Sequence, residues 1–217
     1  MKKENFETYE MDVIDEALTI NEFNLYWKYA LITEDLFYFN FKNEFNWVKT
    51  LNFISNKNKF TFWQCNDEDT KERSYKIKIF LKELPTYGVL YQREVNAIAN
   101  EMCPRCNNEI KDWYHVWKCE RNEVSLEEIL YETIAEYEEI LISDDKKEEV
   151  EILRDININF YEIMLTQSDV LLGYYIIWEL LRGVYNRKFD EISKKKEYKN
   201  LIEHLWNFCY DKYRKRI

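Results

Sequence analysis

The chain has 217 residues, a net charge of −10, and 33% charged against 46% hydrophobic residues, a balance that excludes both a disordered and a membrane-embedded protein. Only 3 Gly and 2 Pro occur, so glycine-rich phosphate loops and turn-dense β-sandwiches are not expected. The first residues lack the apolar stretch of a secretory signal peptide. We therefore expect an intracellular protein without a membrane span, with a nuclear or cytoplasmic location left open.

The hydrophobic pattern predicts a mainly α fold, an irregular bundle of about eight helices. In a first region, residues 1–73, helical periodicity is clearest over residues 17–32. Residues 57–64 alternate and are rich in aromatic side chains, which is compatible with one short β segment. The polar residues 65–72 are interpreted as a loop.

A second region, residues 74–122, begins with a predicted helix over 74–84 that Pro85 ends or redirects. Another helix is predicted over 87–100, because its apolar residues recur at helical spacing. A segment rich in Cys and aromatic residues follows and completes the region.

The third region, residues 123–217, is predicted to be entirely helical. Ser125 and Glu128 form a capping-box pattern that opens its first helix. Further helices are expected over 146–155, over 170–185 with Gly173 and Gly183 inside it, and over 197–214. The three regions are expected to pack as one compact unit.

Three of the five cysteines and one of the two histidines fall within residues 103–119. They are Cys103, Cys106, His115 and Cys119, with the spacing C-x2-C-x8-H-x3-C. Three thiolates and an imidazole suit a tetrahedral Zn²⁺, and residues four apart on a helix point the same way. We therefore predict a zinc site, and four protein ligands predict a structural rather than a catalytic one.

Two other interpretations of the cysteines are open. They are compatible with plain burial, and a C-x2-C pair is also typical of redox sites. A disulfide framework is disfavoured by the missing signal peptide and the odd number of cysteines.

The motifs of this region extend beyond the four ligands. An amphipathic helix leads into Leu84-Pro85-Thr86, a further helical segment follows, and Asp112 and Trp113 come shortly before the histidine. With the Cys/His motif, residues 76–120 resemble the zinc-binding region that follows the reverse transcriptase in many non-LTR retrotransposons. The flanking helices resemble fungal open reading frames derived from such elements. The resemblance implies a zinc-bearing accessory region, either a complete product or part of a larger retroelement protein.

An enzyme is not expected. Reverse transcriptase needs an aromatic-x-Asp-Asp hairpin and a distant Asp to hold two metal ions. The one Asp-Asp pair, Asp144-Asp145, follows a helical pattern and lacks the aromatic residue, so we interpret it as a helix break and cap. His204 and Cys209 lie five residues apart on a predicted helix and point away from each other.

The charge divides sharply along the chain. Residues 123–157 hold 13 acids and 3 bases, whereas residues 158–217 hold 8 acids and 11 bases.

The leading hypothesis is a non-catalytic, zinc-stabilised recognition domain that binds RNA or single-stranded nucleic acid. The alternative is a helical protein-interaction module with a structural zinc and no nucleic-acid role. The predicted nucleic-acid face consists of Arg105, Lys118, Lys194, Lys195, Lys196, Lys199, Lys212, Arg214, Lys215 and Arg216.

Overall fold

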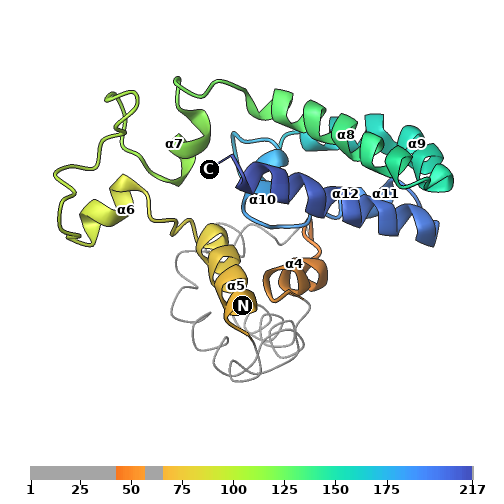
Figure 1. The fold of residues 1–217 in the computed structure, drawn as a ribbon, viewed down its shortest axis with the longest axis horizontal. Helices are drawn as coiled ribbons and strands as arrows, with labels where there is room; N and C mark the ends of the chain where they lie inside the picture. Colours follow the sequence, from red (N-terminus) through yellow and green to blue (C-terminus); the bar gives the residue numbers. More distant parts are fainter. Residues whose placement is uncertain (1–42, 57–65, 217) are drawn as a thin grey trace, which may run out of the picture. The chain divides into compact units, whose positions relative to one another are not determined.

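The computed structural model describes residues 43–56 and 66–216, and these form nine α-helices, α4 to α12 (Figure 1). The described residues contain isolated β-bridges but no strand. The predicted mainly α, irregular fold is therefore confirmed. The predicted helix at 17–32 and β segment at 57–64 lie outside the described residues. Within the described ranges, no helix has both the length and the apolar character needed to cross a membrane.

Two units divide the chain. The first comprises Met1–Leu81 with Gln167–Arg187, and the second comprises Lys82–Thr166 with Lys188–Ile217. The predicted three regions follow the order of the sequence instead, and that division stays a prediction.

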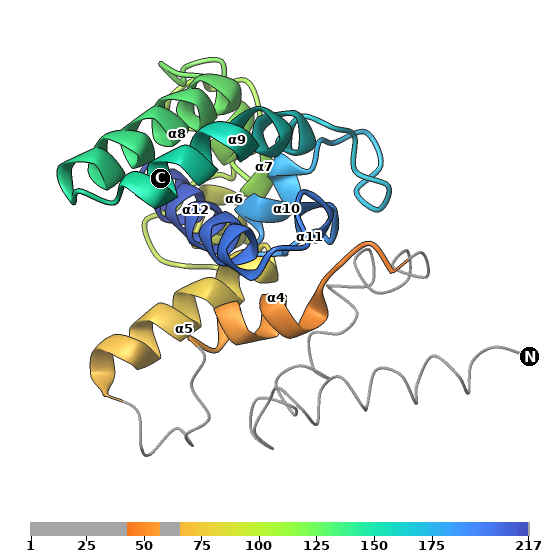
Figure 2. The same ribbon diagram turned by 90° about the vertical axis from the view of Figure 1, so that its right-hand side faces the viewer.

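The first unit contains α4 (Trp47–Ile54), α5 (Asp67–Phe80) and α10 (Ile177–Leu181). Helices α4 and α5 lie side by side (Figure 2). Phe45 and Asn186 form an antiparallel bridge, and the buried guanidinium of Arg182 donates two hydrogen bonds to the carbonyl of Phe80, at 3.1 and 2.9 Å. These contacts join segments separated by more than a hundred positions.

Two predictions in the first unit were wrong. The polar residues 65–72 belong mostly to α5, because Asn66 caps its first turn and Asp67, Glu68 and Asp69 suit the positive end of its dipole. The expected helix over 170–185 is reduced to α10. Gly173 and Gly183 have φ angles of +81° and +75°, left-handed conformations that interrupt the expected helix.

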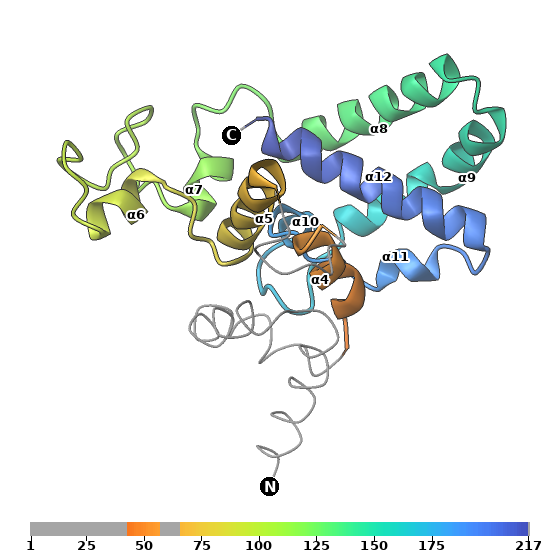
Figure 3. The ribbon, with the colours of Figure 1, turned by 60° about the horizontal axis from the view of Figure 1, so that its bottom comes forward.

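The second unit is built around α8 (Leu126–Ser143), α9 (Lys147–Met164) and α12 (Lys196–Arg214), which pack against one another in all three ribbon views (Figure 3). Their apolar faces meet in a core that includes Leu130, Leu153 and Leu205, all fully buried. The short helix α11 (Lys188–Glu191) adds Phe189, whose ring lies 5.0 Å from that of Phe160 on α9.

Local capping signals explain where the long helices begin and end. The predicted capping box is present: the Ser125 hydroxyl accepts from the N–H of Glu128 at 3.2 Å, and the Glu128 carboxylate accepts from the N–H of Ser125 at 2.8 Å. Asp144 caps the carboxyl end of α8, and Asp145 has a φ of +56°. The Asp-Asp pair is therefore a helix break, as predicted. Helix α9 continues nine residues beyond the predicted end at 155.

Of the remaining helices of the second unit, α6 (Tyr87–Gln92) precedes the Cys/His segment and α7 (Trp113–Lys118) lies within it (Figure 3). Helix α6 is shorter than predicted, because Glu94 and Ala97 have positive φ angles that end it. Thr86 of the Leu-Pro-Thr step caps α6 by accepting from the N–H of Val89 at 3.4 Å. The step thus starts the helix that leads to the Cys/His segment.

Candidate metal centre

The first two predicted ligands lie on a short hairpin, residues 101–111. Met102 and Ile110 form an antiparallel bridge, and the N–H of Cys103 donates to the carbonyl of Glu109 at 2.8 Å. At the turn, the N–H of Asn107 donates to the carbonyl of Cys103 at 2.8 Å, and Asn107 has a φ of +58°. Asn tolerates this left-handed conformation better than most residues, so the turn brings Cys103 and Cys106 to one side.

The other two ligands come from α7. Asp112 caps this helix by accepting from the N–H of His115 at 2.7 Å. Cys119 stands at the carboxyl end, where its N–H donates to the carbonyl of His115 at 2.9 Å. The expectation that these two ligands are placed by one helical turn therefore holds, although Cys119 is the cap residue rather than part of the helix.

The four side chains meet in one buried cluster. Their ligand atoms all lie within 4.8 Å of one another, and all four residues are buried. The Sγ atoms of Cys103 and Cys119 are 3.9 Å apart, and the Sγ of Cys106 lies 3.2 Å from Nε2 of His115. Zn–S bonds of about 2.3 Å in a tetrahedron place two sulfurs about 3.8 Å apart. The donor set and its spacing therefore fit a single tetrahedral ion.

Side chains around the hairpin hold it to the segment that follows α7. Arg105 donates to Asn122 at 2.7 Å, and Asn108 donates to Glu120 at 3.0 Å. The amide of Asn122 also donates to the carbonyls of Val116 and Trp117, which satisfies the end of α7. Sequence reasoning did not identify Asn122, because its role depends on two segments that meet only in the folded chain.

The protein environment lowers the pKa values of the hairpin thiols. Burial is the largest influence on Cys103 and raises its pKa. The N–H groups of Cys106 and Arg105 and the side chain of His115 outweigh burial and lower it to about 6. The pKa of Cys106 is also lowered, chiefly by the N–H of Asn108. Thiolates, not thiols, bind metal ions, so this hairpin is prepared for a cation.

The pKa values of the other two candidate ligands, His115 and Cys119, are raised rather than lowered. Burial raises the pKa of the Cys119 thiol. For His115, burial lowers the pKa, but hydrogen bonds to Cys103 and Glu109 outweigh it, and the pKa is raised. Because the pKa of Cys119 is raised above that of an ordinary thiol, Cys119 holds its proton at neutral pH, and an entering ion must displace it.

The centre is connected to the helical core of the second unit. Trp113 and Trp117 of α7 are buried, and the ring of Trp117 packs edge-on against Tyr213 of α12 at 6.2 Å. Tyr213 donates through its hydroxyl to the carbonyl of Leu126 at 2.6 Å, which also ties the start of α8 to the end of α12. Because both tryptophans are buried, their rings are used in packing.

The ten predicted basic residues do not form one continuous group. Helix α12 has 19 residues and is about 28 Å long, so its two ends are far apart. Its carboxyl end lies near the metal centre through the contact of Trp117 with Tyr213. The residues fall into three sets: Arg105 and Lys118 beside the centre; Lys194, Lys195, Lys196 and Lys199 at the start of α12; and Lys212, Arg214, Lys215 and Arg216 at its end.

The two ends of α12 also differ in their charge partners. At the carboxyl end, Lys212 is paired with Glu136 of α8, and Arg216 with Glu132 at 3.1 Å. At the start, Lys194, Lys196 and Lys199 form no ion pair with any described residue. Two of the four bases at the carboxyl end of α12 are thus paired with carboxylates, whereas three of the four lysines at its start are paired with none of the described carboxylates.

Comparisons of the chain with protein-family models, with curated proteins and with solved structures found no match.

Proposed function

We propose that Cys103, Cys106, His115 and Cys119 bind one zinc ion, and that the chain is a non-catalytic recognition module built around this structural site. The observation that carries the proposal is the meeting of four buried donor atoms within 4.8 Å. Three sulfurs and one nitrogen favour zinc over magnesium or calcium, which prefer oxygen ligands. Bound zinc would contribute its charge and its preference for tetrahedral geometry.

The surroundings of the cluster support a structural role. Four protein donors complete the usual coordination of zinc and leave no position for a reacting water. The hairpin has one β-bridge and α7 has six residues, so neither element can bury enough apolar surface to fold alone. An ion held by both would fix α7, and with it the two tryptophans that pack against the helical core.

For recognition, we propose that the start of α12 binds single-stranded nucleic acid. The resemblance to the retroelement zinc-binding region supports this class of partner. The exposed Lys194, Lys195 and Lys196, with Lys199 one turn further along, place four cations at the positive end of the helix dipole. Phosphate would relieve the repulsion among them.

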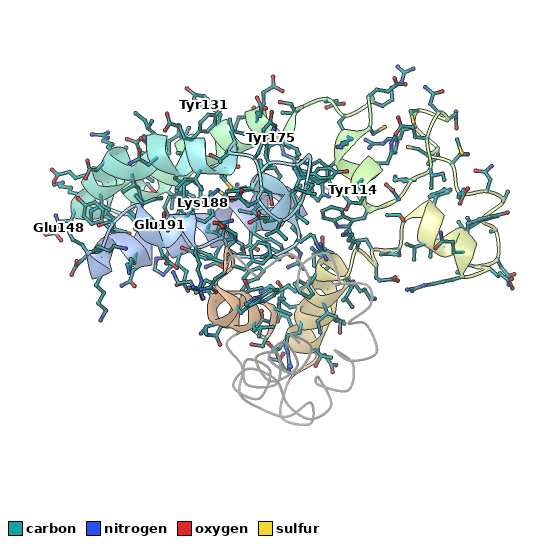
Figure 4. The ribbon with its side chains drawn as sticks, turned by 180° about the vertical axis from the view of Figure 1, so that it is seen from behind. Tyr114, Tyr131, Glu148, Tyr175, Lys188 and Glu191 are labelled. Carbon is teal, nitrogen blue, oxygen red and sulfur yellow. The ribbon has the colours of Figure 1, made fainter. Side chains whose placement is uncertain are left out.

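A second candidate, a protein-interaction module, is favoured by a different observation. Lys212 and Arg216, at the carboxyl end of α12, are paired with carboxylates of α8, and the outer face of that helix is acidic. Tyr131 projects outward from α8, and the residue is 70% exposed (Figure 4). An acidic helix with an exposed aromatic residue suits a basic protein partner better than a polyanion.

The experiment begins with the metal. Protein purified without added zinc is analysed for its metal content, with about one zinc per chain expected from a single four-ligand site. Substitution with Co²⁺ then reports the ligand set, because three sulfurs and one nitrogen give intense tetrahedral absorption. A metal-free protein that gains no Co²⁺ spectrum contradicts the zinc site.

Nucleic-acid binding is measured separately by fluorescence anisotropy, with a labelled single-stranded RNA at 50 to 200 mM salt. We expect the double variant Lys194→Glu/Lys196→Glu to weaken binding and flatten the salt dependence, by roughly 0.7 in slope for each lost phosphate contact. The matched control is Lys146→Glu/Lys147→Glu, at the N-cap and first residue of α9, which changes the net charge equally. If both double variants lose the same amount of RNA affinity, the start of α12 is not the binding face. If the wild type binds no RNA at 50 mM salt, the protein-interaction module is the remaining candidate.

A further inference from the structure

Glu109 contacts three of the four candidate ligands and is not itself one of them. Its carbonyl accepts the N–H of Cys103 at 2.8 Å, and its own N–H bonds to the sulfur of Cys106 and helps to lower the pKa of that thiol. Its carboxylate Oε2 lies 2.9 Å from Nδ1 of His115. One residue at the end of the hairpin thus contacts the backbone of Cys103, the sulfur of Cys106 and the imidazole of His115.

The two nitrogens of His115 face different partners. Nε2 lies on the side of the sulfurs, 3.2 Å from Sγ of Cys106, whereas Nδ1 faces the carboxylate of Glu109. An ionised carboxylate only accepts hydrogen bonds, so Nδ1 must carry the proton. Nε2 then keeps its lone pair directed at the cluster, which is the form of the ring that binds a metal ion.

We propose that Glu109 is a positioning residue of the zinc site: it selects the tautomer of His115 and holds the ring at the angle at which Nε2 points to the ion. This inference rests on the proposed zinc site and deepens it. The side chain of Glu109 is 71% exposed while that of His115 is 5% exposed, so water partly competes for the carboxylate. Removing a carboxylate that orients a metal-binding histidine typically weakens metal binding 10- to 100-fold, and for Glu109 we expect the lower end of that range, about tenfold.

The affinity test compares three variants of the full chain, each titrated with zinc against a chelator of known affinity. Glu109→Ala removes the acceptor and is expected to weaken zinc binding about tenfold. Glu109→Gln keeps an amide oxygen that can accept from Nδ1 and is expected to recover part of the loss. Glu120→Ala is the matched control, since that carboxylate also bonds to an asparagine of the hairpin but does not reach His115. It is expected to stay within about twofold of the wild type, as an exposed polar contact of small energy implies.

A spectroscopic test separates positioning from a general loss of stability. The chain has only two histidines, and His204 lies exposed on α12, so the imidazole ¹⁵N signals provide an internal reference. In the zinc-loaded wild type, we expect a protonated Nδ1 on His115 whose proton exchanges slowly with water. In Glu109→Ala that proton should exchange faster, while His204 is unchanged.

The outcomes of these tests separate the role of Glu109 from the zinc site on which it rests. A wild type that binds no zinc overturns the zinc site, and the positioning role of Glu109 fails with it. A wild type that binds zinc, with Glu109→Ala indistinguishable from Glu120→Ala in affinity and in Nδ1 exchange, overturns the role of Glu109 alone. If Glu109→Ala fails to fold, Glu109→Gln decides, since slow exchange and intermediate affinity are expected only from a retained acceptor.

Discussion

The replacement Cys106→Ser tests whether a bound ion stabilises the second unit. Cys106 is buried, and its sulfur lies 3.2 Å from the imidazole of His115. Serine is close in size, so packing changes little. Its hydroxyl does not ionise at neutral pH and is a poor ligand for zinc, so the variant should lose the ion.

The expected loss follows from mass action. When free zinc is held at a thousand times the wild-type Kd, binding adds about 4 kcal/mol to the free energy of unfolding. For a unit of this size, 1 kcal/mol corresponds to roughly 3–5 °C in melting temperature, so the zinc-dependent shift is about 12–20 °C. The variant should forfeit that shift.

The assay is thermal unfolding followed by circular dichroism, in buffered zinc and in EDTA. The wild type in EDTA and the variant in either buffer should melt together, and the wild type in zinc should melt higher. Cys209→Ala is the control, because Cys209 is fully buried in α12 and outside the cluster. It should lower both melting temperatures of the protein and keep their difference. If Cys106→Ser retains the zinc-dependent shift in full, the reasoning fails.

Three further predictions concern pH and packing. Cys103 has a pKa of about 6 and is a thiolate at neutral pH, whereas the pKa of Cys119 is raised above 9.0, so zinc binding between pH 7 and 8.5 must displace at least one proton. The apparent zinc affinity, measured by chelator competition, should therefore rise about tenfold or more per pH unit in this range. An affinity that does not change with pH contradicts this prediction. Tyr213→Phe removes the hydroxyl that donates to the carbonyl of Leu126 and should lower the free energy of unfolding by about 1–2 kcal/mol in urea titrations, while an unchanged midpoint argues against the bond. Gly88→Ala places a Cβ 3.2 Å from a methyl of Ile110 on the hairpin, which is closer than ordinary contact. We expect this crowding to outweigh the better helix propensity of alanine and to lower the free energy of unfolding by about 1 kcal/mol in urea titrations. A variant more stable than the wild type would contradict this.

Local patterns were sufficient for part of the fold. The capping box of Ser125 and Glu128 and the apolar periodicity beyond it predicted α8, and a similar periodicity predicted α12, because both signals act within one or two helical turns. The asparagine cap and acidic first turn of α5 were local signals too, although the low hydrophobicity of that stretch favoured the wrong interpretation as a loop.

The apolar run over 170–185 shows where local pattern misleads. Hydrophobicity alone does not distinguish a helix from a buried irregular segment. Gly173 and Gly183 take left-handed conformations, and the Ser168 hydroxyl accepts from the N–H groups of Val170 and Leu171. These turns let the segment bring Arg182 to the carbonyl of Phe80, a contact that no short window contains.

The sequence by itself determined which four residues form the candidate metal centre, because ligand type and spacing are local properties of residues 103–119. Only the tertiary structure decided that Glu109 faces His115, and that Lys212 and Arg216 are paired with carboxylates of α8, 76 and 84 positions away. The physical reason is that the sequence shows which residues are charged, whereas whether a charged side chain is paired depends on which side chains pack beside it after folding.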